Sequence, residues 1–255
     1  KYPFNDQVLI YAQRPEAVAC AKIEAWNKQV GRWVNRGAKG IALLSEDNGY
    51  TKLRYVFDIA DTNSKVGKSF RLWSVPKPYE VDIIESLDNK YGELEDISSL
   101  GLAIKSVSKR LVEDNMQDYL EDLKFYRENS SLEPMTDEAV QILFQNALEN
   151  SIAFSMIKRC GLNPNDYFIN EDFTPILAFD SYETITRLGV ATSEISEMGI
   201  REIYNTIKKL RINEINKIRT FDIDKDLSYD VSECRETVYR RNNDEYNLHT
   251  QWGLR

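Results

Sequence analysis

The stretch WNKQVGRWVNRGAKGI, residues 26–41, decides the fold, because the hydrophobic pattern changes along it from helical to extended. Before this change, apolar side chains at helical spacing predict one helix over 5–13, ending before Pro15, and a second over 17–29. After it, glycine- and asparagine-rich turn signals separate three predicted strands at residues 32–35, 41–44 and 53–59. Residues 1–75 are therefore expected to form two helices followed by a small antiparallel sheet.

The chain becomes helical in pattern after Pro76 and Pro78. Apolar stripes predict helices at residues 81–91, 100–111, 137–160, 182–188 and 195–210. The longest is expected at 137–160 and to end at Gly161, while Ser181 and Gly189 are expected to bound a short one. From about residue 216 the apolar pattern fades. The prediction is an α+β chain with a domain at 1–75, a mainly helical domain at 76–215, and a loosely ordered linker or tail at 216–255.

Composition places the chain among ordinary globular proteins, with 42% hydrophobic and 29% charged residues. It contains no apolar run long enough to cross a membrane, and it opens without a signal peptide or a starting Met. An excised fragment of a larger cytoplasmic protein is therefore expected. Cys20, Cys160 and Cys234 are far apart and odd in number, which favours inert thiols in a reducing compartment over disulfides or a zinc site.

The net charge of −8 is unevenly distributed along the chain. Residues 1–75 hold 12 Lys and Arg against 7 Asp and Glu, a balance of +5, and the remainder has a balance of −13. A basic head on an acidic body favours a local site for a polyanion, and the alternative is that the local excess of five charges arises by chance.

Motifs for catalysis are missing from the sequence. The single histidine, His249, lies in the polar tail, so a His-Glu-x-x-His zinc site is impossible. There is no phosphate-binding loop and no Gly-x-Ser-x-Gly elbow, and the acidic run at 93–96 is typical of a solvated surface. We expect no catalytic residue, no metal and no cofactor.

Residues 26–39 combine four cations, Lys28, Arg32, Arg36 and Lys39, with the rings of Trp26 and Trp33. Single-stranded nucleic acid is held by this combination, with cations along the backbone and flat rings under the bases. The alternative is that both tryptophans belong to the core, which suits Trp26 better, and that residues 36–40 form a plain hairpin turn. Polar residues near the first helix, Tyr2, Gln7, Gln13 and Arg14, either bind phosphates and base edges or simply end the helix.

The spacing of these motifs resembles the N-terminal domain of ArdC-type antirestriction proteins, which plasmids and conjugative elements encode. The matching positions are Asn5, Leu9, Gln13, Pro15, Ala17, Trp26, Val34, Arg36, Gly37, Lys39, Gly40, Ile41, Val56, Phe57, Asp58 and Thr62. The match covers about a quarter of the chain and implies a domain that binds single-stranded DNA. With this resemblance, the predicted nucleic-acid-binding residues are Tyr2, Asn5, Gln7, Gln13, Arg14, Arg32, Trp33, Arg36, Lys39 and Arg54.

The rest of the chain, notably residues 150–154, 159–162 and 167–173, more weakly resembles the region that follows this domain in large proteins of conjugative transposons. Those proteins carry helicase and adenine-methyltransferase modules further downstream. The resemblance therefore implies that such modules, in the same polypeptide, are partners of the domains described above. In ArdC-type proteins the second domain resembles a zinc metallopeptidase, with a Glu-bearing helix akin to residues 149–153. Because the His-Glu-x-x-His helix is absent here, the resemblance implies a degenerate, metal-free version.

These observations favour a non-catalytic module that binds single-stranded DNA and serves DNA transfer, remodelling or antirestriction. The alternative is a protein-interaction module, in which the acidic body imitates the charge of DNA and engages a restriction enzyme or another protein. A third alternative is a scaffold for the larger protein.

Overall fold

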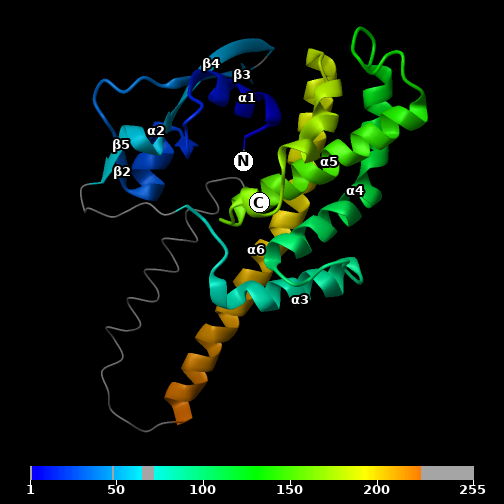
Figure 1. Cartoon of the computed structure of the whole chain (residues 1–255). Coiled ribbons are helices and arrows are strands. Elements are labelled where there is room, and N and C mark those ends of the chain that lie inside the picture. The colour runs from blue at the N-terminus through cyan, green and yellow to red at the C-terminus, as the bar shows by residue number, and fades with distance from the viewer. Residues whose placement is uncertain (1, 48, 65–71, 225–255) are drawn as a thin grey trace. The chain divides into compact units, whose positions relative to one another are not determined.

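The computed structural model describes residues 2–47, 49–64 and 72–224. These residues form two compact units, one ending at Leu72 and the other beginning at Trp73 (Figure 1). The first unit combines short helices with antiparallel strands, and the second is helical, so the predicted α+β class is confirmed. The division falls three residues before the expected boundary after residue 75.

The first unit is organised around a three-stranded antiparallel sheet with the order β1-β4-β3. Its strands are β1 (Cys20–Ala21), β3 (Ile41–Asp47) and β4 (Tyr50–Asp58). β3 and β4 form a hairpin in which Ile41 lies opposite Val56 and Leu44 opposite Leu53. The short 3-10 helix η2 (Ile59–Asp61) follows β4, and β5 (Thr62–Ser64) then pairs with β2 (Arg32–Val34) in a separate two-stranded ladder.

Apolar residues pack on both faces of the three-stranded sheet, because successive side chains of a strand point to opposite sides. On one face, helix α1 (Phe4–Gln13) contributes Leu9 and Ile10 to a cluster formed by Cys20, Ile41, Leu43 and Val56. On the other face, Phe57 packs with the fully buried Trp26 and with Ala19 and Ala21. The interpretation of Trp26 as a core residue is therefore confirmed.

The expected helix over residues 17–29 is wrong in its first half. The chain forms strand β1 there, followed by one turn of helix α2 (Ile23–Ala25) and the π-helix η1 (Trp26–Val30). The physical reason is Asp58, whose Oδ1 accepts the backbone N–H groups of Val18 and Ala19, both at 2.8 Å. This carboxylate holds the segment extended against β4, which a local propensity argument could not anticipate.

The hairpin expected around residues 36–40 is also wrong, because the strands on either side of that turn belong to different ladders. The backbone N–H of Asn35 donates to Asp61 O at 2.8 Å, which continues the pairing of β2 with β5. The chain then turns at Gly37, whose φ of +86° is a conformation that glycine adopts without strain. Residues 36–40 therefore connect two ladders instead of closing one.

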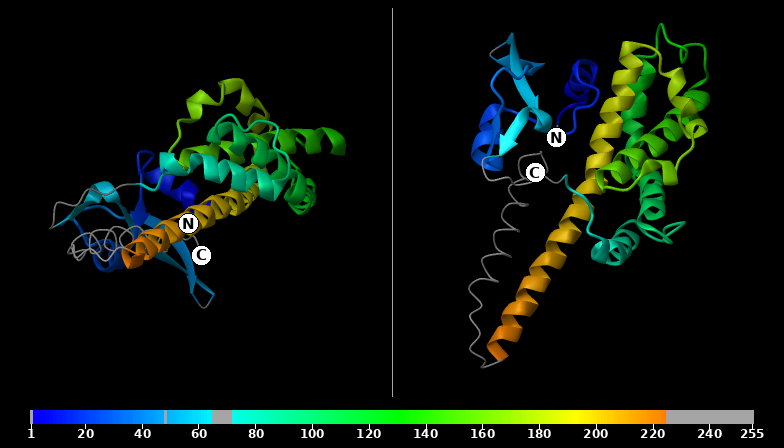
Figure 2. Two further views of the ribbon diagram at one scale, coloured as in Figure 1. Left: turned by 90° about the horizontal axis from the view of Figure 1, so that it is seen from below. Right: turned by 60° about the vertical axis from the view of Figure 1, so that its left-hand side comes forward.

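The second unit is a bundle of long helices (Figure 2). Its helices are η3 (Lys77–Tyr79), α3 (Glu80–Tyr91), α4 (Leu100–Phe125), α5 (Asp137–Arg159), η4 (Pro164–Asp166), η5 (Asn170–Ala178) and α6 (Tyr182–Asp224). Helices α4, α5 and α6 pack against one another in pairs, and α3 packs against α4 and α6. Fully buried side chains such as Ile104, Phe144 and Ile203 fill the space between them.

Two features of the bundle differ from the sequence-based expectation. Helix α4 continues well past residue 111, and α6 runs unbroken through Gly189, which makes α6, not α5, the longest helix. One glycine costs a helix only about 1 kcal/mol, and the buried residues Leu188, Ala191 and Ile195 outweigh that cost by packing in the core. The predicted cap at Ser181 is confirmed, since its Oγ accepts the N–H of Thr184 at 3.1 Å.

The expected tail over 216–255 is wrong at its start, because α6 extends to Asp224. The helix continues beyond the point where the apolar pattern fades, because a helix that is already nucleated can propagate through polar sequence. The rest of the predicted tail lies outside the described residues.

Replacing Asp58 with Ala is expected to open the first unit. The change leaves the N–H groups of Val18, Ala19 and Ala60 without their acceptor, and a buried donor without a partner costs about 1–3 kcal/mol. A total loss of about 3 kcal/mol corresponds to roughly a hundredfold faster amide exchange in peptides covering β1 and β4, measured by hydrogen–deuterium exchange. Replacing the exposed Glu24 with Ala is the control, and equal protection in the two variants would contradict this role of Asp58.

Candidate nucleic-acid interface

Most residues of the spaced motif in the first unit stabilise the fold itself. Trp26 donates from its indole Nε1 to Phe57 O at 2.8 Å, and Thr62 donates from its hydroxyl to Ile59 O at 2.8 Å. Ile41 and Val56 lie in the core. Because these residues are held inside the unit, their spacing in the sequence is explained by the fold and is not evidence for a ligand.

Gln13 closes the free edge of strand β3. Its side-chain Nε2 donates to Ala42 O at 2.8 Å, and its Oε1 accepts from Ala42 N at 2.9 Å. The amide thus makes the pair of hydrogen bonds that a neighbouring strand would make, which blocks the edge against further pairing. Gln13 was predicted to bind nucleic acid, but in the structure its side chain is hydrogen-bonded to the backbone of β3.

Tyr2 and Arg54 belong to a polar cluster between α1 and the sheet. The hydroxyl of Tyr2 donates to Cys20 O at 2.9 Å, and the Arg54 guanidinium lies 5.8 Å from the centre of the Tyr2 ring. Arg54 also forms an ion pair with Asp6, whose side chain is buried. Burial raises the pKa of Tyr2, so its hydroxyl stays protonated and keeps donating. Both residues are used by the fold.

Two further predicted cations are also occupied within the unit. Arg14 pairs with Asp61, and the hydrogen bond to this carboxylate is the main reason that the pKa of Arg14 is raised. Arg32 donates from Nε to Thr62 Oγ1 and from Nη2 to Thr62 O, each at 2.8 Å, across the β2–β5 ladder. Arg14, Arg32 and Arg54 therefore have partners within the unit, and Arg36 and Lys39 are the remaining cations among the predicted binding residues.

Arg36 and Lys39 are exposed on the turn between β2 and β3. Within the described part of the chain, neither side chain makes an ion pair or a hydrogen bond. Asn5 and Gln7 are also exposed, but Gln7 donates to Tyr2 O at 2.8 Å. Trp33 is 39% exposed and alternates along β2 with Val34, which packs toward Trp26, so the indole of Trp33 points away from that cluster.

The turn that carries the two cations lies against one face of the hairpin. A Cβ placed on Gly40 would come within 3.0 Å of Tyr55 Cβ and 3.1 Å of the Phe57 ring. Only glycine fits such a close approach without a shift of its neighbours. Lys39 precedes Gly40, so its Cα lies about 3.8 Å from that of Gly40. The backbone of Lys39 therefore adjoins the point where the chain approaches Tyr55, and Arg36 lies three residues earlier on the same turn.

Tyr55 was missed by sequence reasoning, together with Leu44 and Leu53. All three are exposed, and they lie on the hairpin face that also carries Phe57. One feature of the sequence could have indicated them. Apolar residues occur on both faces of this strand, with Leu53, Tyr55 and Phe57 on one face and Val56 on the other. A strand with two apolar faces needs cover on both sides, and α1 covers only one.

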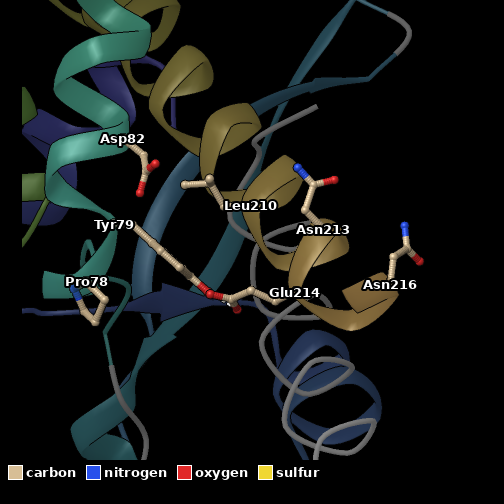
Figure 3. A pocket seen from close by; sticks show the side chains of 7 residues that line it. All are labelled: Pro78, Tyr79, Asp82, Leu210, Asn213, Glu214 and Asn216. Carbon is tan, nitrogen blue, oxygen red and sulfur yellow. Dashed lines mark hydrogen bonds between the residues drawn. The ribbon is translucent and has the colours of Figure 1, made fainter. Parts of the chain in front are cut away.

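The helical unit contains an open hollow, lined by Pro78, Tyr79, Asp82, Leu210, Asn213, Glu214 and Asn216 (Figure 3). The hydroxyl of Tyr79 donates to Glu214 Oε2 at 2.6 Å across it. Burial and this hydrogen bond raise the pKa of Tyr79 to about 12, so the hydroxyl stays protonated. The contact ties η3 to α6, and we assign the hollow no ligand.

The thiols of Cys20 and Cys160 are free and buried, and burial raises the pKa of each to about 12. Cys234 and His249 lie outside the described residues. Across residues 2–47, 49–64 and 72–224, no group of three or more His, Cys, Asp or Glu side chains is placed to hold a metal ion. None of the helices in this part of the chain combines the length and apolar character of a membrane span.

Comparison with known proteins finds no matching family model, no matching curated protein and no matching solved structure. The resemblance to the ArdC-type domain, the metallopeptidase-like body and the roles of the acidic body as a DNA mimic or a scaffold thus stay predictions. So does the absence of catalysis, metal and cofactor.

Arg54 is expected to contribute to the stability of the first unit, whereas Arg36 is not. Replacing Arg54 with Ala leaves the buried Asp6 carboxylate without its cation, which costs about 2 kcal/mol, between the values for exposed and for buried pairs. The melting temperature of the first unit should fall by about 10 °C, as measured by thermal unfolding. Replacing Arg36 with Ala should leave it within about 2 °C.

The Asp6→Asn/Arg54→Ala double variant sharpens this comparison, because it removes the buried charge as well. It should be more stable than Arg54→Ala alone. Equal melting temperatures for the single and double variants would show that the ion pair contributes nothing.

Proposed function

We propose that the first unit binds single-stranded DNA, with Arg36 and Lys39 as its phosphate contacts. The observation that carries this proposal is the pair of exposed cations, which have no partner among the described residues, on a turn packed beside Tyr55. Lysine and arginine side chains that neutralise phosphates release condensed counterions, and this release drives binding.

The distribution of contacts supports Arg36 and Lys39 over the other predicted residues. Arg14, Arg32 and Arg54 are engaged inside the unit, so a phosphate would compete with hydrogen bonds that the fold already makes. Arg36 and Lys39 break no such hydrogen bond or ion pair within the described residues when they bind a phosphate. Both also belong to the spaced motif that resembles the ArdC-type domain, although they lack the structural duties of most other motif residues.

The resemblance supports a wider proposal for the larger protein. The unit would serve as a non-catalytic accessory module of a protein encoded by a mobile element, and it would hold single strands during DNA transfer, remodelling or antirestriction. The helical unit would connect it to helicase or methyltransferase modules of the same chain in the cytoplasm. We propose no reaction for the residues of either unit.

Replacing Arg36 and Lys39 together with Ala tests the phosphate contacts. Two lost contacts should weaken the binding of a labelled single-stranded oligonucleotide several-fold at about 50 mM salt. They should also reduce the slope of log affinity against log salt by about 1 to 1.5, since each phosphate contact contributes about 0.7 for single strands. Fluorescence anisotropy titrations at several salt concentrations measure both quantities.

A matched control removes two exposed cations from the helical unit, Lys77 and Lys209, by replacing them with Ala. This variant has the same change in net charge and should keep the affinity and slope of the unmodified chain. If the Arg36→Ala/Lys39→Ala variant is folded and also keeps both, the turn is not the phosphate site.

A further inference from the structure

The hairpin of the first unit has one face that its own unit leaves largely uncovered. Leu44, Leu53 and Tyr55 are 54%, 59% and 52% exposed. Leu44 lies directly opposite Leu53, and Ala42 lies opposite Tyr55. Because residues two apart on a strand share a face, these side chains form two adjacent rows, which we call the hairpin platform.

The exposure of the platform is unusual for an antiparallel sheet. A solvated sheet face normally carries polar side chains in alternation with the apolar ones that face the core. Here the opposite face is covered by α1 (Figure 1), and the described residues that pack on the platform face gather at Phe57, beside Trp26. A contiguous group of exposed apolar side chains is a candidate binding surface.

The charges around the platform indicate what it binds. At one end, Gly40 lies close to Tyr55, and the turn that precedes Gly40 carries the exposed cations Arg36 and Lys39. At the other end, Glu46 lies opposite Thr51 on the same face, which limits the favourable surface to the two rows nearest the cations. A ligand that fits must offer negative charge beside flat apolar groups.

Single-stranded nucleic acid has this chemistry, whereas a duplex does not. An unpaired base exposes its flat face next to a phosphate, while duplex bases are stacked on one another and closed to an aromatic side chain. Tyr55 and Leu53 lie two residues apart on β4, a separation of about 7 Å. The platform therefore has room for one or two bases, with their phosphates near the turn.

We propose that an unstacked base packs on the ring of Tyr55, with a neighbouring base against Leu53 and Leu44. This inference rests on the proposed function and deepens it, since it restricts the ligand to single strands. It also predicts little sequence preference, because every base has a face that can stack on an aromatic ring.

The test compares the affinities of variants of the 255-residue chain for a labelled oligothymidine at one fixed salt concentration. Tyr55→Ala removes the ring but keeps the Cβ, which is the atom nearest to where a Cβ on Gly40 would lie, so the turn should stay in place. Its affinity should fall about 5- to 150-fold, the effect expected for the loss of one stacked base. Tyr55→Phe should bind like the unmodified chain, because the ring is retained.

Two controls separate stacking from other effects. Tyr11→Ala removes a 68% exposed tyrosine from α1 in the same unit and should not change the affinity. The slope of log affinity against log salt should stay the same in Tyr55→Ala, because no phosphate contact is lost. Tyr55→Leu serves as the second variant if circular dichroism shows that Tyr55→Ala is unfolded.

The outcomes distinguish this inference from the function on which it rests. If Tyr55→Ala binds like the unmodified chain while Arg36→Ala/Lys39→Ala binds weakly, stacking on the platform is overturned and DNA binding by the turn stands. The platform would then be a surface for a protein. If the unmodified chain does not bind the oligonucleotide at all, both are overturned.

Discussion

The carboxylate of Asp58 is the constraint on which the first unit depends. It is 2% exposed, and it accepts the backbone N–H groups of Val18 and Ala19 on one oxygen and of Ala60 on the other. Asp58, the last residue of β4, thus holds both the segment that leads into β1 and the start of η2. Because buried donors must be satisfied, β1 is held beside β4, and the sheet acquires its third strand.

The arrangement of the sheet explains where a ligand can bind. With β1 in place, α1 packs on one face, and Trp26 covers only the end of the other near Phe57. Gln13 occupies the outer edge of β3. Among the described residues, the hairpin platform remains open, and the turn with the exposed cations Arg36 and Lys39 ends at Gly40, close to Tyr55. The proposed interface is therefore the part of the sheet on which the other described residues of the unit do not pack.

Much of the fold could be predicted from the sequence, because hydrophobic periodicity and turn residues act locally. The strands β3 and β4, the helices α1, α3 and α5, and the burial of Trp26 followed from such signals. Strand β1 and the pairing of β2 with β5 could not be predicted, since both depend on contacts between residues about 30 to 40 positions apart.

The candidate site was predictable only in part, and for the same reason. Charge and spacing singled out Arg36 and Lys39, which are exposed, but they equally singled out Arg14, Arg32 and Arg54, whose partners are visible only in the folded unit. The central claim is that this surface holds single strands. Its most direct test is the binding of the unmodified chain to an oligothymidine and to a duplex of equal length, between about 50 and 200 mM salt. We predict saturable, salt-sensitive binding with clear preference for the single strand; equal affinity for the duplex, or no binding at the lowest salt, would contradict the claim.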